Sequence, residues 1–166
     1  MADQQIWYVN GLGVNDTKQV IHFKEKDLGL NVNQLIGNEL SAGAAYHLIS
    51  ANVGYDSGPP IGTTAEQSTL NEVSLFANYN LPCGFYDQFQ ANWWDQGDNK
   101  GFATSEPGDN FWQLNYFAGY RFPRRHLEIQ VGVLNICNRD YHLEPLTYYL
   151  EQAHTRTFVA SLKFNF

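Results

Sequence analysis

Strict alternation of apolar and polar residues is the feature that most constrains what this chain can fold into. In the last segment, Thr157–Phe166, every second side chain is apolar and falls on one face: Phe158, Ala160, Leu162, Phe164 and Phe166. The intervening positions include Ser161, Lys163 and Asn165. A period of two residues is the signature of a β-strand with two different faces.

The same alternation recurs throughout the chain and predicts about eight antiparallel strands. Besides the last segment, the expected strands are Ile6–Asn15, Leu28–Val32, Leu40–Leu48, Val73–Leu81, Phe85–Trp93, Trp112–Phe122 and Leu127–Val133. The first of these has an ambiguous phase, and Asp87 interrupts the apolar row of the fifth. No helical periodicity of useful length is present. The sequence therefore predicts a single all-β domain over residues 1–166.

The connections between these segments alternate in length. Short ones are expected at Ile36–Glu39, Pro82–Gly84 and Pro123–His126, and long ones at Asp16–Lys26, Asp56–Thr69, Gln96–Asn110 and Asn138–Thr155. Short turns at one end and long loops at the other are typical of transmembrane β-barrels of the bacterial outer membrane. With an even strand count, both termini are expected on the short-turn, periplasmic side.

Composition favours a membrane barrel over a soluble sheet. Charged residues make up only 16% of the chain, against about 25% in typical soluble domains, and amides and hydroxyls supply most of the polarity. The net charge of −7 argues against a nucleic-acid partner. No apolar run is long enough for a transmembrane helix, whereas a barrel strand crosses with about 9–11 alternating residues.

Aromatic residues concentrate near the expected strand ends, as in the girdles at membrane–water interfaces. Tyr79, Phe85, Tyr120, Phe122, Phe164 and Phe166 are expected at the inner rim, and Trp93, Trp112 and Phe158 at the outer rim. Alternation alone does not say which face points outward, and a soluble barrel would enclose its apolar residues. The rims, the weakly charged polar face and the terminal Phe favour apolar residues facing lipid.

Two turns predict the strand register. The loop Pro82–Gly84, with Gly84 at positive φ, places Asn78 opposite Gln88 and Ala77 opposite Phe89. The four-residue loop Pro123–His126 places Arg121 opposite Glu128, with Lys163 at a similar height on the next strand. We expect Arg121, Glu128 and Lys163 to form a charge cluster in the lumen with a structural role, the alternative being an ion path.

Two stretches resemble the C-terminal barrel region of TonB-dependent outer-membrane receptors. The stretch Phe117–Asn135 is similar to the penultimate hairpin of that family, and its end, Gly132-Val-Leu-Asn135, continues with Ile-Cys-Asn-Arg-Asp-Tyr141 as in the corresponding family run. The ending Arg156–Phe166 is similar to the family's terminal strand. The resemblance implies energised nutrient uptake by an intact receptor with about 22 strands and a plug. This chain has room for neither the strands nor the plug, so transport does not carry over to the chain alone.

The resemblance also implies a C-terminal signal read by the barrel-assembly machinery, carried by Phe158, Leu162, Phe164 and Phe166. Other expected partners are outer-membrane lipid and an envelope protein. The opening Met-Ala-Asp-Gln-Gln is no signal peptide, so we expect a mature segment or a piece of a longer protein. Three readings stay open: a receptor-like barrel segment, a self-contained small outer-membrane barrel or envelope-complex subunit, and a soluble β-barrel binder.

Chemical sites have little support in the sequence. We expect no enzyme, no cofactor and no metal, although His142, His154, Glu144 and Glu151, or the acidic loop residues Asp95, Asp98, Glu106 and Asp109, are conceivable ligand sets. Ser50 and His47 should lie on opposite faces of a strand. Cys83 and Cys137 are expected at opposite ends of the sheet, too far apart to bridge. The last long loop is unusually apolar, which predicts either a packed cover over the barrel mouth or a partner surface.

Overall fold

The computed structural model describes residues 2–8, 17–56, 63–97, 108–123, 126–143, 146–147 and 149–164. These residues form an all-β antiparallel sheet and contain no α-helix. Its strands are β1 (Ala2–Tyr8), β2 (Thr17–Ile36), β3 (Leu40–Asp56), β4 (Thr63–Asn80), β5 (Phe85–Gln96), β6 (Asn110–Arg121), β7 (Leu127–Leu134) and β8 (Thr157–Phe164).

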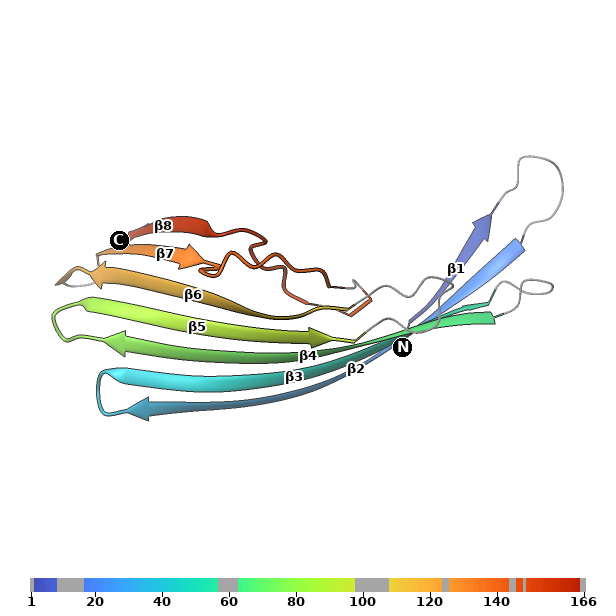
Figure 1. Cartoon of the computed structure of the whole chain (residues 1–166), viewed down its shortest axis with the longest axis horizontal. Helices are drawn as coiled ribbons and strands as arrows, with labels where there is room; N and C mark the ends of the chain where they lie inside the picture. The colour runs from blue at the N-terminus through green and yellow to red at the C-terminus, as the bar shows by residue number, and fades with distance from the viewer. Residues whose placement is uncertain are drawn as a thin grey trace.

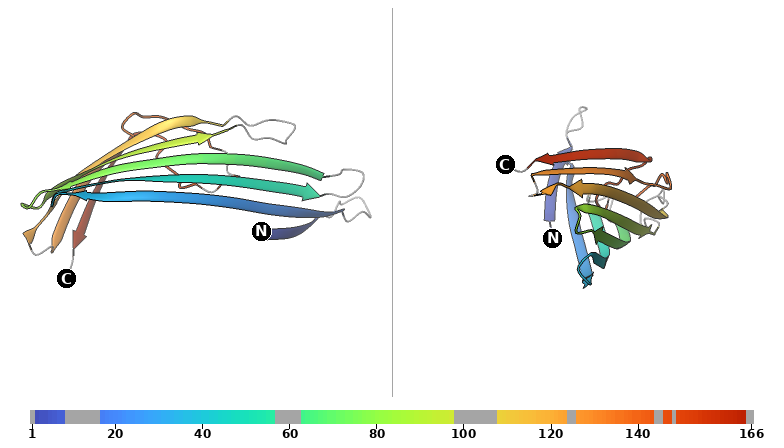
Figure 2. Two further views of the ribbon diagram at one scale, coloured as in Figure 1. Left: turned by 90° about the horizontal axis from the view of Figure 1, so that it is seen from below. Right: turned by 90° about the vertical axis from the view of Figure 1, so that its left-hand side faces the viewer.

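The strands follow one another through the sheet in sequence order, each paired with its chain neighbour (Figure 1). Seen from its end, the sheet follows an arc (Figure 2, right). The ladder begins at β1 and ends at β8, so the sheet is open. The expectation of a closed barrel is therefore met only at the coarser level of an all-β antiparallel meander.

Three strands are much longer than the alternation predicted. β2 starts at Thr17, β3 runs to Asp56 and β4 starts at Thr63, so the predicted loops Asp16–Lys26 and Asp56–Thr69 are wrong over most of their length. The ladder of β2 with β3 continues without a break from Ile36↔Leu40 to Val20↔Asp56. Beyond Leu28 the outward face is largely polar, whereas on the opposite face β3 carries the buried residues Ile49, Ala51 and Val53. The pairing therefore continues where the outward apolar row has ended.

The first strand also differs from its prediction. β1 spans Ala2–Tyr8 rather than Ile6–Asn15, and residues 9–16 lie outside the described part of the chain. Ala2 pairs with Phe23, far from the turn at the end of β2. The start of β1 therefore does not reach the short-turn side, contrary to the expectation for both termini, whereas β8 runs back to that side (Figure 1).

The short turns and the register are as predicted. Gly84 has a φ of 104°, and the Leu81 N–H donates to the Phe85 carbonyl across the turn at 2.8 Å. Asn78 lies opposite Gln88 and Ala77 opposite Phe89. Cys83 and Cys137 are both free and exposed, one in this turn and the other directly beyond β7.

The described residues include no helix long and apolar enough to cross a bilayer. Because the pairing in β2 to β8 is continuous, alternate residues define two faces. We call the face that carries Leu30, Ala44, Leu75, Tyr116 and Val131 the apolar face. The opposite one, which carries Asn115, Gln130 and Ser161, is the amide face.

Candidate functional site

The apolar face is exposed from β2 to β8. Many of its large hydrophobic side chains are exposed, with fractions between 38% and 77%: Leu28, Leu30, Val32, Leu75, Tyr79, Leu81, Phe85, Phe89, Trp112, Tyr116, Phe122, Ile129, Val131, Phe158, Leu162 and Phe164. Buried side chains at the other face include Trp94, Phe111, Gln113 and Asn115. The sheet thus exposes its apolar rows on one face and buries both aromatic rings and amides on the other.

The unbroken apolar rows of this face form a band. On β2 this row ends at Leu28, which pairs with Leu48 of β3, and the next outward positions on that face are Lys26 and Ser50, which also pair. On β4 and β5 the row ends one paired position earlier, at Val73 and Trp93. From Leu28 to Ile36, or from Leu40 to Leu48, the band covers about 26 Å of strand. We call this region, which runs from the short turns to the level of Leu28, the apolar band.

Aromatic pairs stand at both borders of the band. Near the short turns, the Phe85 and Tyr120 rings meet with centroids 4.7 Å apart, and Tyr120 meets Phe122 at 4.9 Å. At the opposite border, Trp93 and Trp112 lie opposite one another, 6.4 Å between centroids. The predicted grouping of these residues is thus reproduced.

Polar atoms of the border aromatics reach past the band. The Trp93 Nε1–H donates to Asn110 at 2.9 Å, and the Tyr79 hydroxyl donates to Glu39 at 2.8 Å. Phe158, Leu162 and Phe164 of the terminal strand share the apolar face, while Phe166 lies outside the described residues.

The predicted charge cluster lies on the amide face near the short turns. Arg121 pairs in register with Glu128, and their Nε and Oε2 atoms are 3.5 Å apart. Lys163 lies opposite Glu128 as predicted. The carboxylate, however, accepts a 2.7 Å hydrogen bond from the Tyr86 hydroxyl, and the Arg121 guanidinium stacks 3.9 Å above the Tyr86 ring. Tyr86 is the member of this group that sequence reasoning missed.

Ring–glycine pairs recur on the same face. Tyr86 lies opposite Gly119, Phe76 opposite Gly43 and Phe117 opposite Gly132. In each pair a Cβ added to the glycine would come within about 2.5 Å of the ring or closer, so the ring occupies the space that a side chain would need. These contacts let bulky rings lie flat across the strands, covering the backbone that glycine leaves bare.

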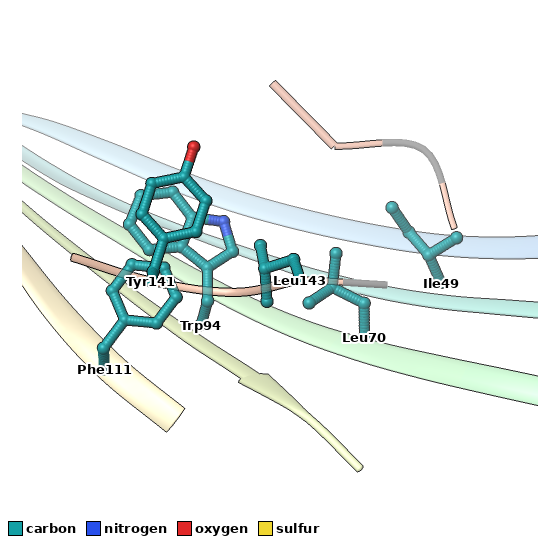
Figure 3. Close-up of a cluster of buried hydrophobic side chains, with 6 residues drawn as sticks. All are labelled: Ile49, Leu70, Trp94, Phe111, Tyr141 and Leu143. Atoms are coloured by element: carbon teal, nitrogen blue, oxygen red, sulfur yellow. The ribbon is translucent and has the colours of Figure 1, made fainter. Parts of the chain in front are cut away.

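The segment between β7 and β8, Asn135–Arg156, folds back over the amide face. We call it the covering segment. Tyr141 and Leu143 are buried with Trp94, Phe111, Leu70 and Ile49 of the strands (Figure 3). The ring of Phe111 stacks between Trp94 at 5.1 Å and Tyr141 at 4.8 Å. The first of the two alternatives for this loop, a packed cover, is therefore what the structure shows.

Asn135 anchors the covering segment. It is fully buried and has a φ of 51°, a conformation that asparagine adopts more readily than most residues. Its Nδ2 atom donates to the carbonyls of Arg139 and Ala153 at 2.8 and 2.9 Å, and its Oδ1 accepts from the Arg139 N–H at 2.8 Å. Its own N–H donates to Asn115 at 2.9 Å, which ties the segment to β6.

A His–Asp contact closes the outer side of the covering segment. His154 stacks on Tyr141 at 4.2 Å, and its Nδ1 lies 2.9 Å from Asp140. The hydrogen bond with His154 and the one from the Tyr141 N–H hold the pKa of the Asp140 carboxyl below its ordinary value. Arg139 reaches Asp109, which directly precedes β6, at 3.0 Å. These polar contacts fasten the segment rather than form a reaction centre.

No group of His, Cys, Asp or Glu within the described residues could hold a metal ion. Of the conceivable ligands, His154 bonds Asp140, Asp109 receives Arg139, and Asp95 accepts from Asn110 at 2.9 Å. Asp98, Glu106 and Glu144 lie outside the described residues. Ser50 and His47 fall on opposite faces of β3.

No family model, curated protein or solved structure matches the chain.

Proposed function

We propose that this chain forms part of the wall of a β-barrel in the bacterial outer membrane and that it is not an enzyme. The observation that carries the proposal is the exposed apolar band, which on β2 runs over residues 28–36 and so matches the stretch of about 9–11 residues with which a tilted barrel strand crosses the bilayer. Aromatic pairs at both borders correspond to the two interfacial girdles. The amide-rich opposite face suits a polar interior.

The open sheet favours the chain as one segment of a larger barrel over a self-contained small barrel. The β8 edge away from β7 and the β2 edge over residues 24–36 carry no partner strand in the described sheet. Backbone N–H and C=O groups without a partner are costly in lipid, so further strands must satisfy them there. Together with the resemblance to TonB-dependent receptors, this suggests the closing strands of a receptor-like barrel.

In this proposal the chain supplies structure rather than transport by itself. The covering segment fills part of the amide face near the loop end, where it would narrow the mouth of a barrel. The terminal strand, with Phe158, Leu162 and Phe164 on its lipid side, would present the signal to the assembly machinery. A soluble binder with an apolar interior is less favoured, because its interior face would be the one that is exposed here.

Detergent dependence and gel migration test the proposal. We expect the chain, assembled with the strands that satisfy its open edges, to need detergent or lipid to stay monodisperse, and to migrate differently on SDS gels before and after heating, because a closed barrel in detergent resists unfolding at room temperature. A chain that is monodisperse without detergent and shows one heat-independent band would contradict it. An unrelated soluble β-protein of similar size, treated alike, serves as the control for gel artefacts.

A further inference from the structure

A basic concavity lies on the outward side of the sheet, directly beyond the apolar band. It has a volume of about 360 Å³ and is lined by Lys24, Lys26, Ser50, Asn52 and Gln67. We call it the border site. It is distinct from the charge cluster of Arg121 and Glu128, which lies on the opposite face near the short turns.

The register fixes the level of the border site. Lys26 pairs with Ser50 and Lys24 with Asn52, while Asn52 pairs in turn with Gln67 of β4. Lys26 is two residues from Leu28 on an unbroken strand, so both project from the same face. The site therefore begins about 7 Å beyond the last apolar row of β2 and β3. On β4 the apolar row ends one paired position earlier, at Val73, and Asn71 lies opposite Leu48.

Charge is segregated between the two faces at this level. Close to the two lysines, Glu25 and Asp27 of β2 and Glu66 of β4 occupy positions of opposite parity and thus the amide face. On the outward face Asp56 lies four residues beyond Asn52, where it pairs with Val20. Within the described residues, neither Lys24 nor Lys26 forms an ion pair. Ion pairs there include those of Arg121, Arg139 and His154. The two ammonium groups face outward beside neutral hydroxyl and amide side chains.

We propose that the border site binds the phosphate group of an anionic lipid at the loop-side surface of the membrane. This inference rests on the proposed membrane insertion, which places the site at the depth of the lipid head groups. Lysine is a common phosphate ligand that acts as a point charge. The Ser50 hydroxyl and the Asn52 and Gln67 amides supply neutral donors for the remaining phosphate and glycerol oxygens.

Titration of single lipids onto the folded protein tests the site. The chain in a neutral detergent is titrated with phosphatidylglycerol or phosphatidylcholine, and bound lipid is counted by native mass spectrometry. We expect the first phosphatidylglycerol to bind more tightly than phosphatidylcholine. The double variant Lys24→Gln/Lys26→Gln should weaken that binding by about 25-fold, since each lysine near an anionic surface contributes about five-fold. Lys163→Gln, on the amide face, should leave it unchanged.

The controls separate the possible failures. Heat-modifiable migration of wild type and variants reports folding independently of lipid binding, so a chain that fails there undermines the proposed function itself. A chain that folds and shows no preference for phosphatidylglycerol, or whose preference survives Lys24→Gln/Lys26→Gln, overturns the border site alone. Displacement of the bound lipid by excess inorganic phosphate would identify a free-phosphate site and would likewise overturn the lipid assignment.

Discussion

Asn135 illustrates at the residue scale how one side chain holds a long connection in place. The amide bonds the carbonyls of Arg139 and Ala153 from the two ends of the covering segment, while the backbone N–H reaches Asn115. The sequence marked Asn135 only through its resemblance to a family motif. Its role could not be predicted, because the bonds exist only once residues 139 and 153 have folded back together.

Two substitutions of Asn135 separate its contributions. Asn135→Gly keeps the positive φ and removes the side-chain bonds, and should destabilise the fold by about 1–3 kcal/mol because buried carbonyls lose their donor. Asn135→Ala adds the strain of a left-handed backbone, a further cost of about 1 kcal/mol. Urea unfolding in detergent measures both, and limited proteolysis reports release of the covering segment. Equal stability of wild type and Asn135→Gly would contradict the anchoring role.

Gly119 should tolerate no side chain. A Cβ at this position would lie 2.5 Å from the Tyr86 ring and 2.6 Å from the Ile129 carbonyl, so Gly119→Ala must displace the ring that bonds Glu128. We expect a loss of about 1–3 kcal/mol, as for other overpacked sites. Gly97→Ala is the matched control, since nothing lies within 4 Å of its added Cβ. Urea midpoints that shift equally in the two variants would contradict this packing.

At the element scale, alternation located the strands well only where one face is apolar. β5 and β6 were predicted nearly to their ends, and the turn chemistry around Gly84 gave the register of β4 and β5. The outer parts of β2, β3 and β4 were missed because the outward row turns polar there, at Lys24, Asn52 and Gln67, while the apolar row of β3 changes to the opposite face at Ile49, Ala51 and Val53. Those parts are held by the backbone ladder between neighbours, which a single strand's sequence does not reveal.

The face assignment predicts that an arginine costs much more free energy of unfolding at one residue of β2 than at its neighbour. Val32 is 72% exposed at the middle of the apolar band, and Asn31 is exposed on the amide face. In lipid vesicles, Val32→Arg should cost about 2–4 kcal/mol, as a charge at the bilayer midplane does. Asn31→Arg should cost far less. Urea unfolding from vesicles measures both, and equal losses would speak against lipid on the apolar face.

At the scale of the whole molecule, two faces and two edges define what the chain can do. In the proposed barrel, the apolar face contacts lipid, and the unpaired edges of β2 and β8 pair with further strands. The sequence predicted the two faces, because they follow from residue parity. It did not predict the open arc, because closure depends on how many strands share the barrel and on their stagger.

Spin labels along β8 test the central claim, the orientation of the two faces, most directly. Single cysteines at positions 158–163, in a chain with Cys83→Ser and Cys137→Ser, are labelled with a nitroxide in lipid vesicles. Collisions with oxygen report hydrocarbon, and collisions with a water-soluble nickel complex report water. We predict oxygen contact at Phe158, Ala160 and Leu162, alternating with nickel contact at the residues between them. The reverse phase, or uniform contact with nickel, would contradict the account.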